Sequence, residues 1–225
     1  MMMKAILNNH RQLNSLVKCT LSKIRFFHLA SYSKLPSMIG KEEQIVSEIL
    51  ALYDRYGNND YIGEPVSQIE HMSQAAQLAI AAKAEDEVVL AAFFHDIGHI
   101  CVAKNNSNDM DGYGIVEHEK IGADFLREKG FPENIAELVG SHVEAKRYLT
   151  FKYPDYLANL SEASRKTLEH QGGVMTSEEA NAFEQNPLFE QMILLRKWDE
   201  QAKETRKAII DLEVIRKKAL DVLRR

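Results

Sequence analysis

The most apolar stretch of this 225-residue chain ends in a histidine and an acid. Residues 88–94 read Val-Val-Leu-Ala-Ala-Phe-Phe, and His95 and Asp96 follow at once. A segment that is apolar on nearly every side predicts a central, buried helix. A carboxylate at the end of such a helix loses its hydration, which is unfavourable unless a cation pairs with it. The chain must therefore fold so that other polar groups reach this buried end.

The rest of the chain from residue 39 onward also follows helical spacing. Ile45, Ile49 and Leu52 recur every three or four residues, and Ser67 with Glu70 matches a capping box. No segment alternates with the period of a strand, and 5 Pro and 11 Gly are too few for a turn-rich β fold. We therefore predict an all-α, single-domain fold. One expected helix contains residues 45–52, and two more start at Ser67 and at about Glu85. The others cover residues 117–129, 132–149, 177–184 and 187–224, and we expect an irregular stretch over residues 150–176.

The first forty residues differ in composition from the rest. Residues 1–41 contain seven Lys or Arg and no Asp or Glu. Basic, acid-free segments that form an amphipathic helix are typical of organellar transit peptides. We therefore predict a mitochondrial targeting segment over residues 1–37 and an enzyme domain over residues 38–225. The alternative is a disordered extension on a cytoplasmic protein that begins at Met38, and the sequence does not decide whether residues 1–37 are cleaved.

The composition excludes several classes of partner. A net charge of −5 gives no basis for nucleic-acid binding. The chain has no apolar run of about eighteen residues, so we expect no membrane span. Its two cysteines cannot form a disulfide scaffold, which favours a reducing compartment. We expect a small-molecule partner, while no oligomeric state follows from the sequence.

Five histidines fall within the predicted helical core. They are His71, His95, His99, His118 and His142. A single buried histidine is usually explained by packing, but four inward histidines and a His-Asp pair on different helices predict a metal site. Neutral imidazole binds Fe, Zn, Mn or Co, and one carboxylate can bridge two cations. The ligand types alone do not identify the metal.

The spacing of these residues resembles a known superfamily. His71, the pair His95-Asp96, His118, His142 and Asp199 follow the pattern H…HD…H…H…D, with separations of 24, 22, 24 and 57 residues. This pattern resembles the HD-domain superfamily and implies a helical bundle with a dinuclear metal site in its core. The commonest chemistry of that superfamily is metal-dependent phosphohydrolysis of a nucleotide or another phosphoester.

Other stretches resemble a smaller branch, the mixed-valent di-iron phosphonate oxygenases of the PhnZ and TmpB type. These stretches are residues 61–64, 142–150, 160–164, 171–173 and 196–203. The resemblance implies two iron ions (Fe²⁺ and Fe³⁺) and O₂ as co-substrate. It implies cleavage of the C–P bond of 2-amino-1-hydroxyethylphosphonate or its trimethylammonio relative, with phosphate and glycine or glycine betaine as products. An HD phosphohydrolase is the alternative.

The resemblance also implies roles for the metal-binding residues. Asp96 would bridge both irons, and His71, His95 and Asp199 would complete one of them. His118 and His142 would hold the other iron, which keeps open positions for substrate and O₂. Asp96, His118 and His142 are therefore expected catalytic residues, together with Tyr61, which would cover the open iron until substrate arrives.

The remaining candidates are substrate contacts. Lys146 lies one turn after His142, and Arg196 lies three residues before Asp199, so each shares a helix face with a ligand. We expect these two cations, with His99 as a third, to bind the phosphonate. Ser164 would add a hydroxyl group. At the other end of the substrate, Glu64 and Tyr61 are expected to bind the amine.

Overall fold

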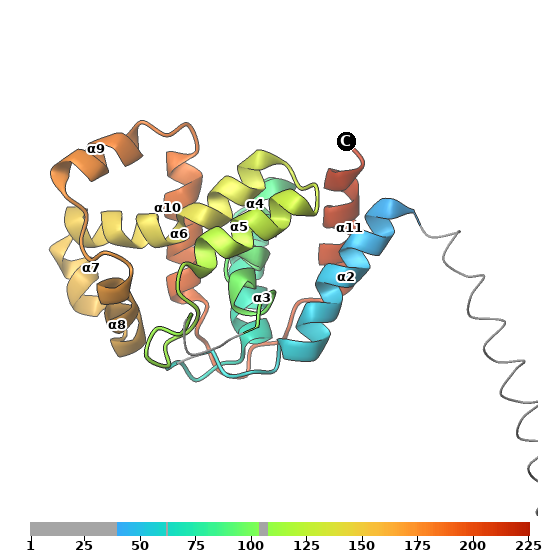
Figure 1. The fold of residues 1–225 in the computed structure, drawn as a ribbon, viewed down its shortest axis with the longest axis horizontal. Helices are drawn as coiled ribbons and strands as arrows, with labels where there is room; N and C mark the ends of the chain where they lie inside the picture. The colour runs from blue at the N-terminus through green and yellow to red at the C-terminus, as the bar shows by residue number, and fades with distance from the viewer. Residues whose placement is uncertain (1–39, 62, 104–107) are drawn as a thin grey trace, which may run out of the picture. The chain divides into compact units, whose positions relative to one another are not determined.

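Figure 1 shows a computed structural model of the chain, which describes residues 40–61, 63–103 and 108–225. The predicted targeting segment, residues 1–37, lies outside the described residues, so its role stays a prediction. Residues 42–225 form one compact unit. In the described part of the chain, the β pairing consists of two isolated bridges, Asp60 with Ser67 and Asp109 with Ile115. The prediction of an all-α fold is confirmed.

The helices occur in the following order along the described chain. They are α2 (Lys41–Tyr56), α3 (Gln68–Ala81), α4 (Asp86–Phe94), the 3₁₀ turn η1 (Ile97–His99), α5 (His118–Glu128), α6 (Glu133–Lys152), α7 (Pro154–Asn159), α8 (Glu162–His170), α9 (Ser177–Glu184), α10 (Phe189–Gln201) and α11 (Leu212–Leu223). None of them is both long enough and apolar enough to cross a membrane.

Helix α4 is the centre of the fold, as its composition predicts. Residues 89–94 are all buried, and α4 packs against α3, α6, α10 and α11 (Figure 1). The chain leaves α4 through η1, which packs on α5. A Cβ atom at Gly98 would overlap the carbonyl oxygen of His118, so the glycine permits this close approach. The approach brings the end of α4 to the start of α5.

The stretch over residues 150–176 is not irregular, and that prediction is wrong. It contains two short helices, α7 and α8. Pro154 occupies the first turn of α7, and the Ser161 hydroxyl accepts a hydrogen bond from the Ser164 N–H at the start of α8. Ala163 and Leu168 of α8 are buried. Helix α8 therefore packs as an ordinary amphipathic helix.

The prediction of a single helix over residues 187–224 is also wrong, because residues 202–211 separate α10 from α11. The Gln74 side chain of α3 accepts from the backbone N–H of Glu204 and donates to its carbonyl, both at 3.0 Å. Gln77 donates to the Ala208 carbonyl at 2.8 Å. These long-range bonds replace helical ones. The helix break also leaves the Ala202 carbonyl free to accept from a buried histidine of α3.

Candidate functional site

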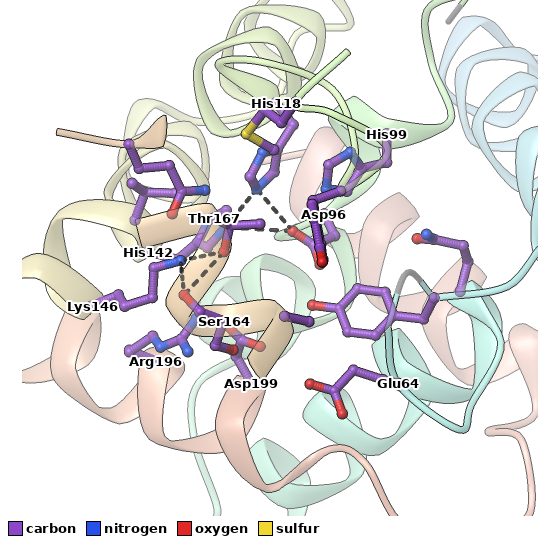
Figure 2. Close-up of a pocket in the computed structure, with 17 residues that line it drawn as sticks. Glu64, Asp96, His99, His118, His142, Lys146, Ser164, Thr167, Arg196 and Asp199 are labelled. Carbon is purple, nitrogen blue, oxygen red and sulfur yellow. Dashed lines mark hydrogen bonds and ion pairs between the residues drawn. The ribbon is translucent and has the colours of Figure 1, made fainter. Parts of the chain in front are cut away.

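The six predicted metal ligands converge on one buried cluster. They come from five helices or helix ends, and Figure 2 labels four of them. Each is at most 4% exposed. They are His71 of α3, His95 and Asp96 after α4, His118 at the start of α5, His142 of α6 and Asp199 of α10.

The four histidines of the cluster are held in the same tautomer. Each Nδ1 lies 2.8–3.2 Å from a backbone carbonyl oxygen, which can only accept a hydrogen bond. Nδ1 therefore carries the proton in every ring, and each Nε2 presents a lone pair to the cluster. This arrangement is typical of metal-binding histidines, whose outward nitrogen is fixed by a carbonyl. The carbonyls belong to Ala202, Ala92, Ile115 and Val139.

The inward nitrogens are too close together for an uncharged cluster. His71 Nε2 lies 3.0 Å from His95 Nε2, and His118 Nε2 lies 3.0 Å from His142 Nε2. Two lone pairs repel at this distance unless a cation lies between them. Although burial lowers it, the carboxylates of Asp96 and Asp199 raise the pKa of His95 to about 9, so without a metal a proton on His95 Nε2 is the cation between this pair. The donor set therefore fits two positive metal ions.

Asp96 joins the two histidine pairs. Its Oδ2 lies 3.6 Å from His71 Nε2 and 3.3 Å from His95 Nε2. Its Oδ1 lies 3.2 Å from His118 Nε2 and 3.4 Å from His142 Nε2. Each oxygen thus faces one pair, which is the arrangement that a bridging carboxylate needs. Both groups, His71–His95–Asp96 and Asp96–His118–His142, offer donor atoms within 4.8 Å of one another.

Asp199 adds a fourth donor to one side only. Its Oδ1 lies 3.3 Å from His71 Nε2 and 3.9 Å from His95 Nε2. We call His71, His95, Asp96 and Asp199 the four-donor half of the cluster. The Arg196 guanidinium donates through Nη1 to Asp199 Oδ2, which leaves Oδ1 for the cluster. Burial opposes ionisation of Asp199, but Arg196 and the histidines hold its pKa well below the usual range.

The other side, which we call the three-donor half, consists of Asp96, His118 and His142. A cavity of about 50 Å³ opens against it. All three residues line this cavity, and so does Asp199 of the four-donor half, whereas His71 and His95 do not. Such a volume holds a few water molecules or a small ligand. The cavity therefore reaches the cluster where protein donors are fewest.

Lys146 is a buried cation in the wall of this cavity. Its Nζ donates to Thr167 Oγ1 at 2.9 Å and to the Ser164 carbonyl at 3.5 Å (Figure 2). Among the described residues it forms no ion pair, although it is only 3% exposed. Burial, and then the charge of Arg196, lower the pKa of Lys146 to about 7. The arrangement favours an anionic ligand, which would supply the missing charge.

Arg196 also lines the cavity but is already paired. It donates to Asp199 through Nη1, to Glu200 through Nη2 and to the Tyr156 hydroxyl through Nε at 2.9 Å. Two carboxylates therefore neutralise the guanidinium. The sequence predicts a phosphonate contact here, whereas the observed geometry gives Arg196 the task of orienting Asp199.

His99 lines the cavity as a neutral ring, and not as the predicted cation. Its Nδ1 accepts from the Ile115 N–H at 3.2 Å, so that nitrogen carries no proton. Burial and the neighbouring His118 hold the pKa of His99 well below the usual range. Its ring stacks on His118, with centroids 4.0 Å apart. His99 therefore offers the cavity a single N–H donor, at Nε2.

Tyr61 lies against the cluster beside His71. Its ring stacks on His71, with centroids 3.9 Å apart, and its hydroxyl hydrogen-bonds to Asp96. Burial and the charge of Asp96 raise the pKa of Tyr61 well above the usual range, so the phenol stays protonated. The tyrosine thus lies against the four-donor half as well as the bridging carboxylate.

Glu64 is at the cavity but is not free. Its Oε1 forms an ion pair with Lys203 Nζ at 2.9 Å and accepts from the Ser161 hydroxyl at 2.6 Å. This differs from the prediction of a carboxylate awaiting a substrate amine. Ser164 lines the cavity, and its Oγ lies 3.3 Å from Lys203 Nζ, while its contact with the phosphonate stays a prediction.

Sequence reasoning missed Thr167, Gln171 and Lys203. Thr167 and Gln171 line the cavity, and the Gln171 Oε1 is buried without a hydrogen-bond partner. They follow Ser164 by three and seven residues, so they share its side of the helix. This spacing indicates a shared helix face only once residues 162–170 are known to form helix α8. Lys203 lies beyond the end of α10, and no local pattern identifies its partner.

Comparisons with known proteins agree with this site. The chain matches the HD domain family over residues 69–224. It is 46% identical over 180 residues to an uncharacterized protein of Acanthamoeba polyphaga mimivirus, covering 80% of this chain and 82% of that one. It is 42% identical over 159 residues to the glycine-betaine-forming 1-hydroxy-2-(trimethylamino)ethylphosphonate dioxygenase of Leisingera caerulea (71% and 80%). It is 38% identical over 168 residues to the hydroxymethylphosphonate dioxygenase of Gimesia maris (75% and 83%).

Proposed function

The chain belongs to the HD-domain family, in the branch of its phosphonate dioxygenases, and we propose that it cleaves the C–P bond of a small 1-hydroxyphosphonate with O₂. One observation carries this proposal. Lys146, a buried lysine without an anionic partner among the described residues, lies in a small cavity against the three-donor half of a two-centre His/Asp cluster. The activities of the Leisingera caerulea and Gimesia maris relatives supply the reaction type.

The reaction balances with O₂ as the sole oxidant. The C–P bond and the C–H bond of the carbinol carbon break, and one new C–O bond and one new P–O bond form. O₂ supplies both new oxygen atoms and accepts four electrons, and the hydrogen of the carbinol carbon leaves as a proton. The substituted carbinol leaves as a carboxylate and the phosphonate as phosphate. A pair of iron ions, one Fe²⁺ and one Fe³⁺, supplies the one-electron chemistry with O₂ when bound. His71, His95 and Asp199 would hold one ion, His118 and His142 the other, and Asp96 both.

The protein residues around the cluster bind and orient the substrate. The Lys146 ammonium, with its position set by Thr167, neutralises the phosphonate. The Nε2–H of His99 donates to the same anion or to the carbinol oxygen. Tyr61 lies over the cluster and keeps water from its Asp96 side. Ser164 offers a hydroxyl group beside the lysine.

Three head groups are compatible with this reaction. The resemblance of the sequence favours 2-amino-1-hydroxyethylphosphonate, which gives glycine, or its trimethylammonio relative, which gives glycine betaine. The Gimesia maris relative acts on hydroxymethylphosphonate. All three share one carbon that carries both a hydroxyl and a phosphonate group. The proposed function depends only on that shared unit.

Oxygen uptake and phosphate release test the proposal. The full chain, loaded with iron, is given each of the three hydroxyphosphonates and a panel of nucleotides. We expect one phosphate released for each O₂ consumed, from at least one phosphonate. Phosphate from a nucleotide without oxygen uptake would instead make the protein an HD phosphohydrolase, the alternative that the ligand pattern alone permits.

A further inference from the structure

The two halves of the cluster differ in the negative charge of their donors. The four-donor half contains two carboxylates, Asp96 and Asp199. The three-donor half contains only Asp96, which it shares with the other half. Neutral imidazole carries no charge, so the donors of the three-donor half compensate less of the charge of a divalent ion. A further carboxylate close to this half would therefore strengthen its hold on a metal ion.

Glu119, the residue after His118, places a carboxylate beside that ligand. Its Oε2 lies 3.6 Å from His118 Nδ1, the ring nitrogen that faces away from the cluster. In the described part of the chain, the other three histidines of the cluster approach carboxylates only through Nε2. The contact of His118 Nδ1 with the Ile115 carbonyl, 3.2 Å, is also the longest of the four carbonyl contacts. The N–H of His118 thus lies near two acceptors, one of them charged.

The Glu119 carboxylate is buried without a lysine or arginine to pair with it among the described residues. Glu119 is 7% exposed, and its Oε2 accepts no hydrogen bond there. The neighbouring Lys120 pairs with Glu117 instead. Desolvation of a carboxylate oxygen is unfavourable unless positive charge faces it. The group that faces Oε2 is the His118 N–H.

Metal binding and this contact should therefore strengthen each other. A metal ion on Nε2 withdraws electrons from the imidazole ring and makes the N–H at Nδ1 more positive. The N–H then attracts the Glu119 carboxylate more strongly. Because coupling between two interactions is reciprocal, the carboxylate raises the metal affinity of His118 by the same factor.

Glu119 lies on the side of His118 away from the catalytic cavity. It lines a separate hollow of about 380 Å³, whose described lining comes mostly from α5 and α6 and shares no residue with the catalytic cavity. A substrate in the catalytic cavity would not reach Glu119. Any effect of this residue on the reaction must therefore act through His118.

We propose that Glu119 is a positioning residue that makes His118 a stronger ligand and so retains the metal of the three-donor half. It supplies at one remove the negative charge that Asp199 supplies directly in the four-donor half. This inference rests on the metal binding that the proposed function requires, but not on the identity of the substrate.

Metal release from the full chain tests this role. The wild type and Glu119→Gln are loaded anaerobically with two equivalents of Fe²⁺, and release to excess chelator is followed. We expect Glu119→Gln to release the equivalent of the three-donor half about tenfold faster and the other equivalent at the wild-type rate. Glu119→Ala should behave in the same way. Asp199→Asn assigns the two phases, because it should accelerate release from the four-donor half instead.

A purely structural role of Glu119 would give a different result. Glu119 lies in the first turn of α5, where a negative charge stabilises the helix whether or not metal is bound. Thermal unfolding of the metal-free variants measures that contribution separately. Asp124→Asn is the matched control, because Asp124 also lies on α5 and lines the same hollow but pairs with Arg127 at 2.8 Å. It should leave both phases of release unchanged.

Different outcomes refute different statements. Wild-type release from both Glu119→Gln and Glu119→Ala, whatever the unfolding temperature of the metal-free protein, would refute the role of Glu119. Equal acceleration of both phases would refute it as well, because the effect would then not act through His118. A wild type that binds no pair of metal ions would refute the proposed function itself.

Discussion

The two halves of the cluster share Asp96 but are built differently. In the four-donor half, Asp199 completes the set and Arg196 fixes Asp199, with its own charge neutralised by two carboxylates. In the three-donor half, His118 and His142 face a cavity whose nearby cation, Lys146, forms no ion pair within the part of the chain that the structure describes. Each half thus combines imidazole groups with a cation on a helix. In the four-donor half this cation orients a metal ligand, which favours retention of the metal. In the three-donor half it lines the cavity, which favours binding and exchange of a ligand.

The largest effect should come from the residue that joins the halves. Asp96→Ala removes a donor from both, so we expect loss of paired metal binding and at least about a 10³-fold loss of activity. Metal content by mass spectrometry and oxygen uptake measure both. Asp221→Ala, on an exposed part of α11, is the control. A variant at Asp96 that still binds two metals would contradict the bridging arrangement.

The three-donor half should need Lys146 to bind substrate but not to bind metal. Lys146→Met removes the unpaired cation, so we expect KM for the phosphonate to rise by about 10²-fold while metal content stays the same. Lys120→Met is the matched control and should leave KM unchanged, because Lys120 is exposed and pairs with Glu117 on the protein surface. Unchanged substrate affinity in Lys146→Met would remove the main support for an anionic ligand at this position.

The four-donor half should show the reverse pattern. Arg196→Met frees Asp199 to rotate, so we expect metal affinity to fall about ten- to hundredfold, with a smaller change in phosphonate affinity once metal is saturating. Competition with a fluorescent chelator measures the first and calorimetry the second. The control is Arg216→Met, whose ion pair with Glu213 lies on α11. If metal affinity is normal and phosphonate affinity falls, Arg196 contacts the substrate as the sequence predicts.

A further prediction concerns the stability of the metal-free protein and its pH dependence. Burial lowers the pKa of Lys146 from 10.5 to about 7, so between pH 7 and 10.5 the unfolded chain binds a proton that the folded chain does not. In the metal-free protein the free energy of unfolding should therefore rise with pH across this window, by up to about 1.4 kcal/mol per pH unit from this group. Urea unfolding of wild type and Lys146→Met across the window measures the difference. Equal slopes would show that Lys146 keeps its ordinary pKa.

Local contacts explain why so much of the cluster could be predicted. His95, His118 and His142 each place Nδ1 on the carbonyl three residues earlier. For His95 and His142 that carbonyl belongs to the preceding helical turn, whereas for His118 it belongs to Ile115, just before α5, so each orientation depends on a short stretch of chain. Helical spacing also places the apolar residues of α4 in the core. These features depend on short stretches of chain, which a sequence shows directly.

The features that sequence missed depend on long-range contacts. The Nδ1 of His71 bonds to the carbonyl of Ala202, which is 131 residues away and is available only because α10 ends there. The break after α10 is stabilised by Gln74, and it also positions Lys203 against Glu64. Spacing within a helix therefore predicts the same phosphonate contact for Arg196 and Lys146. Tertiary contacts distinguish them, because Arg196 is paired with two carboxylates and Lys146 forms no ion pair among the described residues.

Metal release tests the difference between the two halves most directly. Protein loaded anaerobically with two equivalents of iron is mixed with a chelator, and iron loss is followed with and without hydroxymethylphosphonate. We predict two phases, with one equivalent lost faster from the three-donor half and with phosphonate slowing that phase alone. Loss of both equivalents in a single phase that phosphonate does not change would contradict this account of the site.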